Sequence, residues 1–410
     1  MLIEQQIAER QARATSAVKR VLERPASGKY GDYKIKSSSG RSYRVALRGP
    51  GLFDNYCSCP DFAVNTLGTC KHIEAMLSRV RRKTLETAEY KRNRASISLK
   101  YGDTIEVWLH LPAAPSQELL ALAAQYFDPS GLLLRAHYRQ FSEVLAAIQK
   151  ADDQAVVYSD VLEYLDRENE LAEGVELERK LLAKLKLDKD PVPGLLKTNL
   201  LPYQTRGALF AACRGRVVLA DDMGLGKTVQ ALAATELLRR RKGIARVLVI
   251  APASVKYQWK TEIEKFTERA AQVIDGPLPR RQAQYASPSF FTLTSYELAL
   301  KDVQYMHGLK PDLIILDEAQ RIRNWETATA RTIKQLKSRY AFVLTGTPLE
   351  NKLEELFSVV EFVDGRRLGP AFRFLHEHRM EDSERPFAGV SRLGPHSRSN
   401  GAHSAAAHAR

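Results

Sequence analysis

A glycine-rich stretch near the middle of the chain, Asp221–Thr228, constrains the fold more than any other segment. The apolar run 217–220 before it predicts a buried strand, and residues 229–238 after it predict a helix with one apolar stripe. Strand, glycine loop and helix in this order form the context that a phosphate-binding loop needs. Gly224 and Gly226 allow backbone N–H groups to point inward at phosphate oxygens, and the helix N-terminus adds the positive end of its dipole. The stretch therefore predicts a site for a phosphorylated ligand.

Two side chains at the start of the predicted helix complete this phosphate site. Lys227 would reach the β- and γ-phosphates, and the hydroxyl of Thr228 would hold Mg²⁺. The usual pattern has a glycine five residues before its Gly-Lys pair, where this chain has Asp221. The alternative, an ordinary left-handed glycine turn without a ligand, leaves the combination of strand, glycines, Lys-Thr pair and helix unexplained.

From Leu200 onward, apolar runs of strand type alternate with helical patterns, which predicts a parallel sheet covered by helices on both faces. Ligands of such sheets bind at the carboxyl ends of the strands. The strands that we expect are 217–221, 246–251, 290–294, 313–317 and 341–345.

An acidic pair, Asp317-Glu318, follows one of these apolar runs. Such a pair is costly to desolvate unless it meets a cation or water. With a phosphate loop in the same sheet, Asp317 is expected to hold Mg²⁺ and Glu318 to act as the general base that polarises the attacking water. For Asp317 taken alone, an acidic helix N-cap remains the alternative. The stripe of Val255, Trp259, Ile263 and Phe266 on a later helix is expected to belong to the core.

Near the N-terminus, three of the four cysteines lie close to a histidine. Their pattern is C-x-C, ten residues, then C-x-H, formed by Cys57, Cys59, Cys70 and His72. Three thiolates and one imidazole make a complete tetrahedral shell for Zn²⁺. We expect a helix to start near Lys71, with Cys70 just before it. The alternative is three small buried thiols beside a core histidine.

The remaining segments suggest structure more than chemistry. Residues 1–24 have helical spacing, whereas 32–36 and 41–48 predict a β-hairpin. Between residues 96 and 190 we expect a small α+β connector: a strand pair in 97–109 and helices over 119–126, 141–148 and 170–187. A basic run follows the cysteines and is expected to be a solvated helix face, with phosphate contacts as the alternative. It consists of Arg79, Arg81, Arg82, Lys83, Lys91, Arg92 and Arg94.

The net charge of +14 over 410 residues points to a polyanionic partner, nucleic acid before a membrane surface. The chain has no apolar run long enough to span a membrane, and we expect no signal peptide in its first residues. Clustered free cysteines suggest metal binding in a reducing compartment, so a cytoplasmic location is expected, nucleoid-associated in a bacterium.

The sequence resembles two known protein families. The cysteine–histidine pattern, with Pro60-Asp61-Phe62 after the second cysteine and Lys71-His72-Ile73 at the histidine, resembles the SWIM zinc finger over about residues 53–80. The sequence Asp317-Glu318-Ala319-Gln320 and the glycine-rich stretch are similar to the Swi/Snf-type helicase-related ATPases of superfamily 2. This second resemblance covers about residues 195–378, and the main departure from its pattern is Asp222, where the family usually has glutamate.

The second resemblance implies an α/β fold, namely a RecA-like P-loop lobe that follows a small zinc-finger α+β region. It implies that Gln204 reads the adenine edge and that Lys227, Asp317 and Glu318 are catalytic. The residues expected to bind the nucleotide are Gln204, Asp222, Met223, Gly224, Leu225, Gly226, Lys227 and Thr228. Segments 251–254, 258–259 and 294–297 resemble the DNA-contacting motifs, and 344–351 resembles the motif that couples ATP state to DNA movement. For Ser254 and Ser295, an ordinary helix cap is an equal alternative to a phosphate contact.

The expected domains are 1–95 with the finger, 96–190 as the connector, 195–380 as the first RecA-like lobe and 381–410 as a disordered tail. Relatives of this type have a second lobe, whose arginines are worth about 10³ to 10⁵ in rate. A truncated or frameshifted frame is the simplest interpretation of residues 381–410, so we expect weak turnover and no translocation.

These observations predict an ATP-dependent DNA translocase or helicase-related ATPase that uses ATP, Mg²⁺ and Zn²⁺. Duplex DNA is the expected partner, a protein partner at the finger is a second possibility, and the oligomeric state is open. The competing hypothesis is a non-motor module whose zinc finger binds DNA or protein beside a vestigial ATP-binding lobe.

Overall fold

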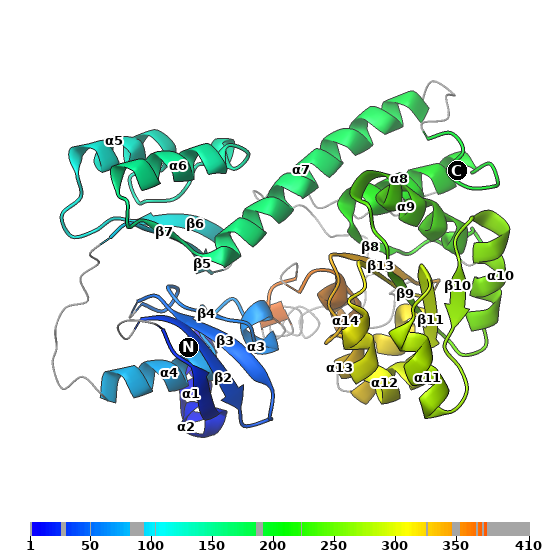
Figure 1. Ribbon diagram of the computed structural model, residues 1–410, viewed down its shortest axis with the longest axis horizontal. Coiled ribbons are helices and arrows are strands. Elements are labelled where there is room, and N and C mark those ends of the chain that lie inside the picture. Colours follow the sequence, from blue (N-terminus) through cyan, green and yellow to red (C-terminus); the bar gives the residue numbers. More distant parts are fainter. Residues whose placement is uncertain are drawn as a thin grey trace, which may run out of the picture. The chain divides into compact units, whose positions relative to one another are not determined.

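The computed structural model describes most of the chain (Figure 1). The described residues are 2–25, 30–49, 51–82, 94–102, 104–185, 192–222, 224–324, 327–346, 353–365, 368–370 and 373–374. They form two compact units, one built mainly from residues 1–170 and one mainly from residues 171 onward. The division falls inside helix α7 (Ser159–Leu185), whereas the sequence places boundaries near residues 95 and 190. The expected tail, 381–410, lies outside the described residues.

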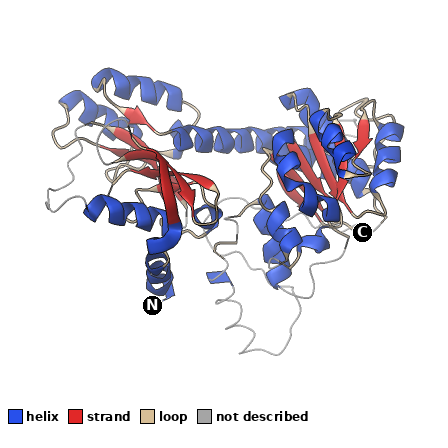
Figure 2. Cartoon of the chain, turned by 60° about the horizontal axis from the view of Figure 1, so that its bottom comes forward, coloured by secondary structure: helices blue, strands red, loops and turns tan. Residues whose placement is uncertain are grey.

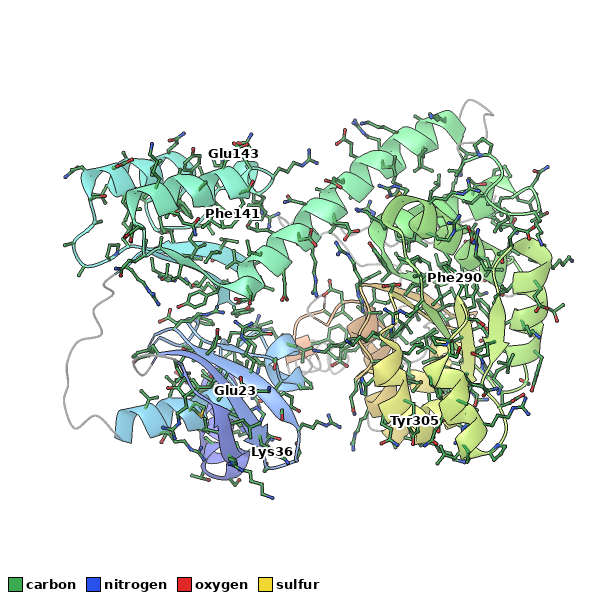
Figure 3. The ribbon with its side chains drawn as sticks, viewed as in Figure 1. Glu23, Lys36, Phe141, Glu143, Phe290 and Tyr305 are labelled. Carbon is green, nitrogen blue, oxygen red and sulfur yellow. The ribbon has the colours of Figure 1, made fainter. Side chains whose placement is uncertain are left out.

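The first unit contains a four-stranded antiparallel sheet with the order β1-β2-β3-β4. The predicted hairpin is confirmed as its central pair. Along β2, exposed and buried residues alternate, so that Lys36 points to solvent while Ile35 faces the core (Figure 3). The strand bounds are β1 (Val18–Glu23), β2 (Gly31–Ser37), β3 (Ser42–Leu47) and β4 (Tyr56–Cys57).

The predicted helix over residues 1–24 is wrong in its last third. Helices α1 (Leu2–Ala12) and α2 (Ala14–Ala17) are present, but the chain then becomes strand β1. Val21 pairs with Ile35 of β2, and this edge pairing overrides the helical spacing. β-Branched residues such as Val18 and Val21 suit a pleated surface as well as a helix, so local pattern alone does not distinguish the two.

A second, three-stranded sheet with the order β6-β5-β7 completes the first unit. The strand pair and two of the helices predicted here are confirmed, and the third helix is the longer α7. Both sheets share one hydrophobic core, which contains Ile35, Ile73, Ile97 and Val144. The remaining elements are α3 (Pro60–Val64), α4 (Lys71–Arg82), β5 (Ser96–Tyr101), β6 (Ile105–His110), α5 (Gln117–Tyr126), η1 (Arg135–His137), α6 (Phe141–Ala151) and β7 (Val156–Val157).

A buried ion pair also joins the antiparallel sheet of this unit to helix α7. Arg48, just after β3, makes two hydrogen bonds to Asp160 in the first turn of α7, at 2.6 and 3.0 Å. The two side chains are only 3% and 8% exposed. The Tyr101 hydroxyl donates to the same carboxylate, and the guanidinium lies 4.1 Å from the ring centroid of Tyr158. The zinc-finger region and the connector expected from sequence are therefore packed into one unit.

The second unit is built on a six-stranded, fully parallel sheet with the order β10-β11-β9-β12-β13-β8. All five predicted strands are present. The sixth, β10, was not predicted because it has three residues at the edge of the sheet. The bounds are β8 (Arg216–Leu219), β9 (Val247–Ala251), β10 (Ala271–Val273), β11 (Phe291–Ser295), β12 (Leu313–Leu316) and β13 (Tyr340–Leu344).

Helices cover both faces of this sheet (Figure 2). Alternate residues of each strand enter two separate cores: Ile315 packs with α8, α9 and α10, whereas Ile314 and Leu316 pack with the other helices. The bounds are α8 (Pro202–Arg214), α9 (Lys227–Lys242), α10 (Lys256–Phe266), α11 (Leu278–Ala286), α12 (Tyr296–Leu309), η2 (Ala319–Ile322), α13 (Ala328–Ile333) and α14 (Leu353–Val363).

Helix α9 differs from its prediction, because it is buried all round rather than along one stripe. Every residue from Gln230 to Leu238 is buried, including Glu236. Glu236 is held by Arg239 and Arg269, each at 2.9 Å. None of the helices in the described part of the chain combines the length and apolar content that a bilayer span requires.

Candidate nucleotide site and metal centre

The glycine-rich stretch forms a loop between β8 and α9. Gly224 and Gly226 have φ angles of 84° and 72°, in the left-handed region that favours glycine. Gly226 is the N-cap residue of α9, and Lys227 is its first helical residue. Apart from its chain neighbours, no heavy atom of the described residues lies within 4 Å of where a β-carbon on Gly224 would stand. The loop therefore presents open backbone next to a helix N-terminus, as an anion site requires. Met223 lies outside the described residues.

Lys227 turns back onto this loop. Its Nζ donates to the carbonyl oxygens of Asp221 and Asp222, at 2.8 and 2.9 Å. Phosphate oxygens would offer the same cation stronger, charged acceptors. The ammonium group thus already lies over the loop and would exchange two carbonyl partners for a phosphate.

Asp221, which stands where other phosphate loops have glycine, is tied to α9. Its Oδ2 accepts a hydrogen bond of 2.8 Å from Nε2 of Gln230, a fully buried residue one turn into the helix. Gln230 was not among the site residues predicted from the sequence. An amide on an otherwise apolar helix stretch is the feature that distinguishes it.

Gln204, expected to contact adenine, lies at the start of α8. Its Oε1 accepts from the backbone N–H of Leu201 at 3.0 Å, which fixes the side chain at the helix N-terminus. Its Nε2 would lie 2.6 Å from a β-carbon on Gly226, so the amide lies directly against the loop. The structure thus brings Gln204 to the phosphate loop, and the adenine contact stays a prediction.

The acidic pair follows β12. Both oxygens of Asp317 accept hydrogen bonds: Oδ1 from the backbone N–H of Glu318 at 3.0 Å, and Oδ2 from the indole Nε1 of Trp259 at 2.8 Å. Burial raises the pKa of the Asp317 carboxyl, and the bond from Trp259 and the charge of Lys227 oppose that rise. A metal ion would compensate the remaining cost of this buried carboxylate.

Glu318 adopts a left-handed backbone conformation, with φ of 50°. For a residue with a β-carbon this conformation costs about 1–3 kcal/mol, and such residues cluster at functional sites. Its Oε2 accepts a hydrogen bond of 2.6 Å from Nε2 of Gln320. The candidate base is therefore oriented by the residue two positions later, an arrangement suited to a water-activating carboxylate.

The loop and the acidic pair both follow the carboxyl ends of strands, on the same side of the parallel sheet. The strands that carry them, β8 and β12, are parallel and are both hydrogen-bonded to β13. Because neighbouring strands are about 4.8 Å apart, the two loops are about 10 Å apart across the sheet. Thr345 and Gly346 follow β13 between them, and the N–H of Thr345 donates to Leu219 at 3.1 Å. Residues 347–351 of the coupling motif lie outside the described part.

The two serines expected at strand ends differ in their surroundings. Ser295 is buried, and its hydroxyl caps α12 by accepting from the N–H of Leu298 at 3.3 Å. Its role is therefore the helix cap that we left open as an alternative. Ser254 is exposed, and α10 has Val255, not Ser254, as its N-cap residue. Of the two, Ser254 is the one free to face a phosphate.

The predicted metal ligands converge in the first unit. The ligand atoms of Cys57, Cys59, Cys70 and His72 all lie within 4.8 Å of one another, and all four residues are buried. Strand β4 carries Cys57, and Cys59 is the N-cap of α3, where its Sγ accepts from the N–H of Phe62 at 3.4 Å. Helix α4 begins just after Cys70, as predicted.

The donor set fits a tetrahedral zinc ion. At bond lengths of about 2.0–2.3 Å, tetrahedral ligands are separated by about 3.3–3.8 Å. His72 Nδ1 lies 3.9 Å from Cys57 Sγ, which points this nitrogen into the cluster. Burial raises the pKa of the Cys57 and Cys70 thiols, and hydrogen bonds from these two thiols lower that of Cys59. A cation is what would allow all three sulfurs to be thiolates together.

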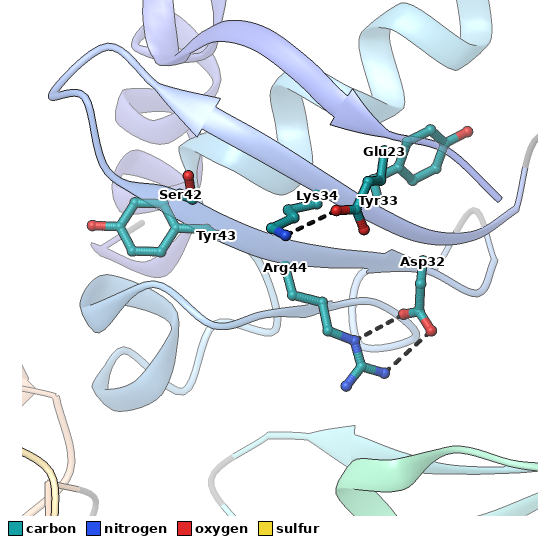
Figure 4. Close-up of a pocket in the computed structure, with 7 residues that line it drawn as sticks. All are labelled: Glu23, Asp32, Tyr33, Lys34, Ser42, Tyr43 and Arg44. Atoms are coloured by element: carbon teal, nitrogen blue, oxygen red, sulfur yellow. Dashed lines mark hydrogen bonds and ion pairs between the residues drawn. The ribbon is translucent and has the colours of Figure 1, made fainter. Parts of the chain in front are cut away.

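The other candidate features carry less chemistry. Of the basic run, Arg79 donates to the backbone oxygen of Val18 at 2.8 Å and so belongs to the fold, whereas Lys83, Lys91 and Arg92 lie outside the described residues. Figure 4 shows a pocket of about 310 Å³ on the antiparallel sheet. Its charged walls are paired with one another, Lys34 with Glu23 and Arg44 with Asp32.

Comparisons with known proteins match two families along the chain. The family model of the SNF2-related domain matches residues 134–397, more than half of the chain. The model of the SWIM zinc finger matches residues 43–81, which include all four candidate zinc ligands.

Among curated proteins, an uncharacterized ATP-dependent helicase of Mycoplasma genitalium, MG018, is 30% identical over 267 residues, which cover 63% of this chain and 24% of that protein. The putative ATP-dependent helicase/translocase YwqA of Bacillus subtilis is 30% identical over 298 residues, covering 64% and 32%. The chain thus spans about a quarter to a third of their length. Among solved structures, the Sulfolobus solfataricus SWI2/SNF2 ATPase core in complex with dsDNA is 34% identical at a TM-score of 0.42, covering 45% of this chain and 40% of that one.

Proposed function

The chain belongs to the SNF2-related family and carries a SWIM zinc finger, and from this premise we propose that it is an ATP-dependent DNA translocase or helicase-related ATPase. One observation supports the nucleotide site above all others. The open glycine loop with Lys227 and the acidic pair Asp317-Glu318 follow two parallel strands at one edge of the sheet, separated by a single strand.

Each residue at this edge has a proposed role in binding ATP·Mg²⁺. The loop N–H groups and Lys227 would bind the phosphates, Thr228 and Asp317 would hold the metal, and Gln204 would contact the adenine. Bound there, Mg²⁺ would neutralise charge that develops on the phosphates. Glu318, oriented by Gln320, would accept the proton of the attacking water.

Duplex DNA is the proposed polyanionic partner. The net charge of +14 supports it, and so does the exposed Ser254 at the carboxyl end of β9, at the same edge as the phosphate loop. The two curated relatives are described as helicases, one of them also as a translocase. Contacts would be made to the DNA backbone, without base recognition.

We also propose that Cys57, Cys59, Cys70 and His72 bind one structural Zn²⁺. The ion would join strand β4 to the start of α3 and the start of α4. In this role zinc binding would contribute directly to folding. A protein partner at the finger remains a prediction.

Nucleotide binding tests the site most directly. Calorimetry with ATP·Mg²⁺ should detect binding to the wild-type chain and no binding to Lys227→Ala. The matched control is Lys301→Ala, which removes an exposed lysine from α12 and should bind as the wild type does. If Lys227→Ala bound ATP·Mg²⁺ with the same affinity as the wild type, the proposed nucleotide site would be refuted.

Turnover tests the motor and its alternative. ATP hydrolysis is measured with and without double-stranded DNA, and Glu318→Gln serves as the blank. DNA-stimulated turnover that is lost in Glu318→Gln supports the translocase. Nucleotide binding with turnover no higher than the blank would support a zinc-finger binding module beside a vestigial lobe.

A further inference from the structure

The hydrogen bond between Trp259 and Asp317 joins two segments that lie 58 residues apart in the chain. Trp259 is on α10, which follows β9, and Asp317 follows β12, the strand hydrogen-bonded to β9. The indole is 2% exposed and packs in the core beside Ile263, which agrees with the prediction of a core residue. Its N–H, however, is directed at the carboxylate expected to hold the metal.

We propose that Trp259 is a positioning residue, whose indole N–H holds Oδ2 of Asp317 in the orientation in which this carboxylate binds Mg²⁺. This inference rests on the proposed ATP·Mg²⁺ site and adds a residue to it. Trp259 touches neither nucleotide nor metal and acts only through Asp317.

The geometry favours orientation over simple packing. The backbone N–H of Glu318 holds Oδ1 and the indole holds Oδ2, so the carboxylate is fixed at both oxygens. Each oxygen keeps further lone-pair capacity for a metal ion or for its bound water. Both donors are neutral, so the aspartate retains the negative charge that attracts Mg²⁺. An arginine or lysine in place of Trp259 would compete with the cation.

The same hydrogen bond links the metal carboxylate to the segment proposed to meet DNA. Ser254 is exposed just before α10, and Trp259 is in the second turn of this helix. A shift of α10 would therefore move the donor that holds Asp317. Trp259 is buried among side chains of the sheet core, so such a shift would be transmitted and not absorbed by a mobile side chain.

The chain contains a matched control in Trp108. Its Nε1 donates to Oε2 of Glu106 at 3.0 Å, on strand β6 of the other compact unit. It is likewise a tryptophan–carboxylate pair, but it lies on a strand that carries none of the proposed nucleotide or metal ligands. Replacement of either indole by phenylalanine removes the N–H and keeps an aromatic ring.

The first test measures how nucleotide binding depends on Mg²⁺ in Trp259→Phe, Trp108→Phe and the wild type. We expect Trp259→Phe to raise the Mg²⁺ concentration for half-maximal binding by about 10- to 100-fold, as the loss of an outer-shell partner does at metal sites. Binding in EDTA should not change, and Trp108→Phe should match the wild type. A folded Trp259→Phe with wild-type Mg²⁺ dependence would overturn the inference.

The second test needs no variant of Trp259. The chain has three tryptophans, so ¹⁵N-labelled indoles give few NMR peaks. Asp317→Asn, and separately Mg²⁺ with nucleotide added to the wild type, should each move the Trp259 peak and leave the Trp108 peak in place. A Trp259 peak that moves in neither experiment would overturn the inference. Failure of the proposed function looks different: the wild type would then show no Mg²⁺-dependent nucleotide binding at all.

Discussion

Gly207 of α8 lies directly against the side chain of Gln230 of α9: a β-carbon at position 207 would come within 1.9 Å of Gln230 Oε1. Gln230 is fully buried and its other amide atom, Nε2, holds Asp221 of the phosphate loop. The close approach of these two helices therefore also determines where one end of the loop is held.

Gly207→Ala should consequently destabilise the second unit by about 1–3 kcal/mol, the usual cost of overpacking a core. The added methyl group has no space unless Gln230 gives up its place, so nucleotide affinity should fall as well. Chemical denaturation and calorimetry measure the two effects. Gly308→Ala is the control, because a β-carbon at that position on α12 would meet no described heavy atom within 4 Å beyond its own helix backbone. Equal stability of the two variants would contradict the prediction.

The buried pair of Arg48 and Asp160 predicts a large loss of stability in Asp160→Asn. The replacement leaves an uncompensated guanidinium with 3% exposure, which costs about 3–5 kcal/mol in such sites. The measurement is urea denaturation of the first unit, followed by a probe such as Trp108 fluorescence.

Glu23→Gln provides the comparison for this pair. It breaks the exposed ion pair between Glu23 and Lys34, in which the side chains are 66% and 52% exposed, and should cost less than about 1 kcal/mol. If Asp160→Asn were as mild as Glu23→Gln, the buried pair would not be a main link between the antiparallel sheet and α7.

The metal centre predicts about one zinc ion per chain after purification without chelator, because the cluster has four ligands for a single tetrahedral ion. Cys70→Ser should lose the zinc and the cooperative unfolding of the first unit. Cys213→Ser removes the remaining cysteine, which is buried on α8 in the other unit, and should keep the full zinc content. Elemental analysis decides, and zinc-free wild-type protein would refute the centre.

Cys213 itself predicts a pH dependence of stability. Burial raises the pKa of its thiol from an ordinary value of 9.0 to about 11. The unfolded chain loses this proton first, so the thiol's contribution to stability is complete below pH 9 and is lost as the pH rises to about 11. Two pKa units correspond to roughly 2–3 kcal/mol.

The measurement is the difference in unfolding free energy between the wild type and Cys213→Ala, from pH 7 to pH 11. The free energy of unfolding of the wild type minus that of the variant should be constant up to pH 9 and should decrease at higher pH. Other alkaline groups titrate equally in both proteins and cancel in this comparison. Parallel curves over the whole range would show that the folded chain does not hold the thiol proton.

Much of this protein could be predicted where the relevant residues are close together in the sequence. The glycine loop depends on neighbours at Asp221–Thr228, and the zinc pattern spans only Cys57 to His72. Both kinds of site require particular residue types at short spacing, so sequence alone selected them. The strands of the parallel sheet were predicted for a similar reason, since each is a short apolar run bounded by turn residues.

Prediction failed where a local pattern suits two structures. Val18 and Val21 fit a helix by spacing and a strand by their branching, and only pairing with β2 decides between them. Similarly, α9 has an apolar stripe, but the contacts of α8 and α10 bury the rest of its surface as well. Neither the partner strand nor the covering helices can be identified from the segment itself.

The sequence by itself determined the chemistry available at the site: a cation and glycines in a phosphate loop, an acidic pair after a strand, and a complete set of zinc ligands. Only the tertiary structure decided which groups hold them, such as Trp259 on Asp317 and Arg48 on Asp160. The members of these pairs are 58 and 112 residues apart. Their contacts exist because β9 lies beside β12 and because the first residues of α7 contact the antiparallel sheet, and strand order is a property of the folded chain alone.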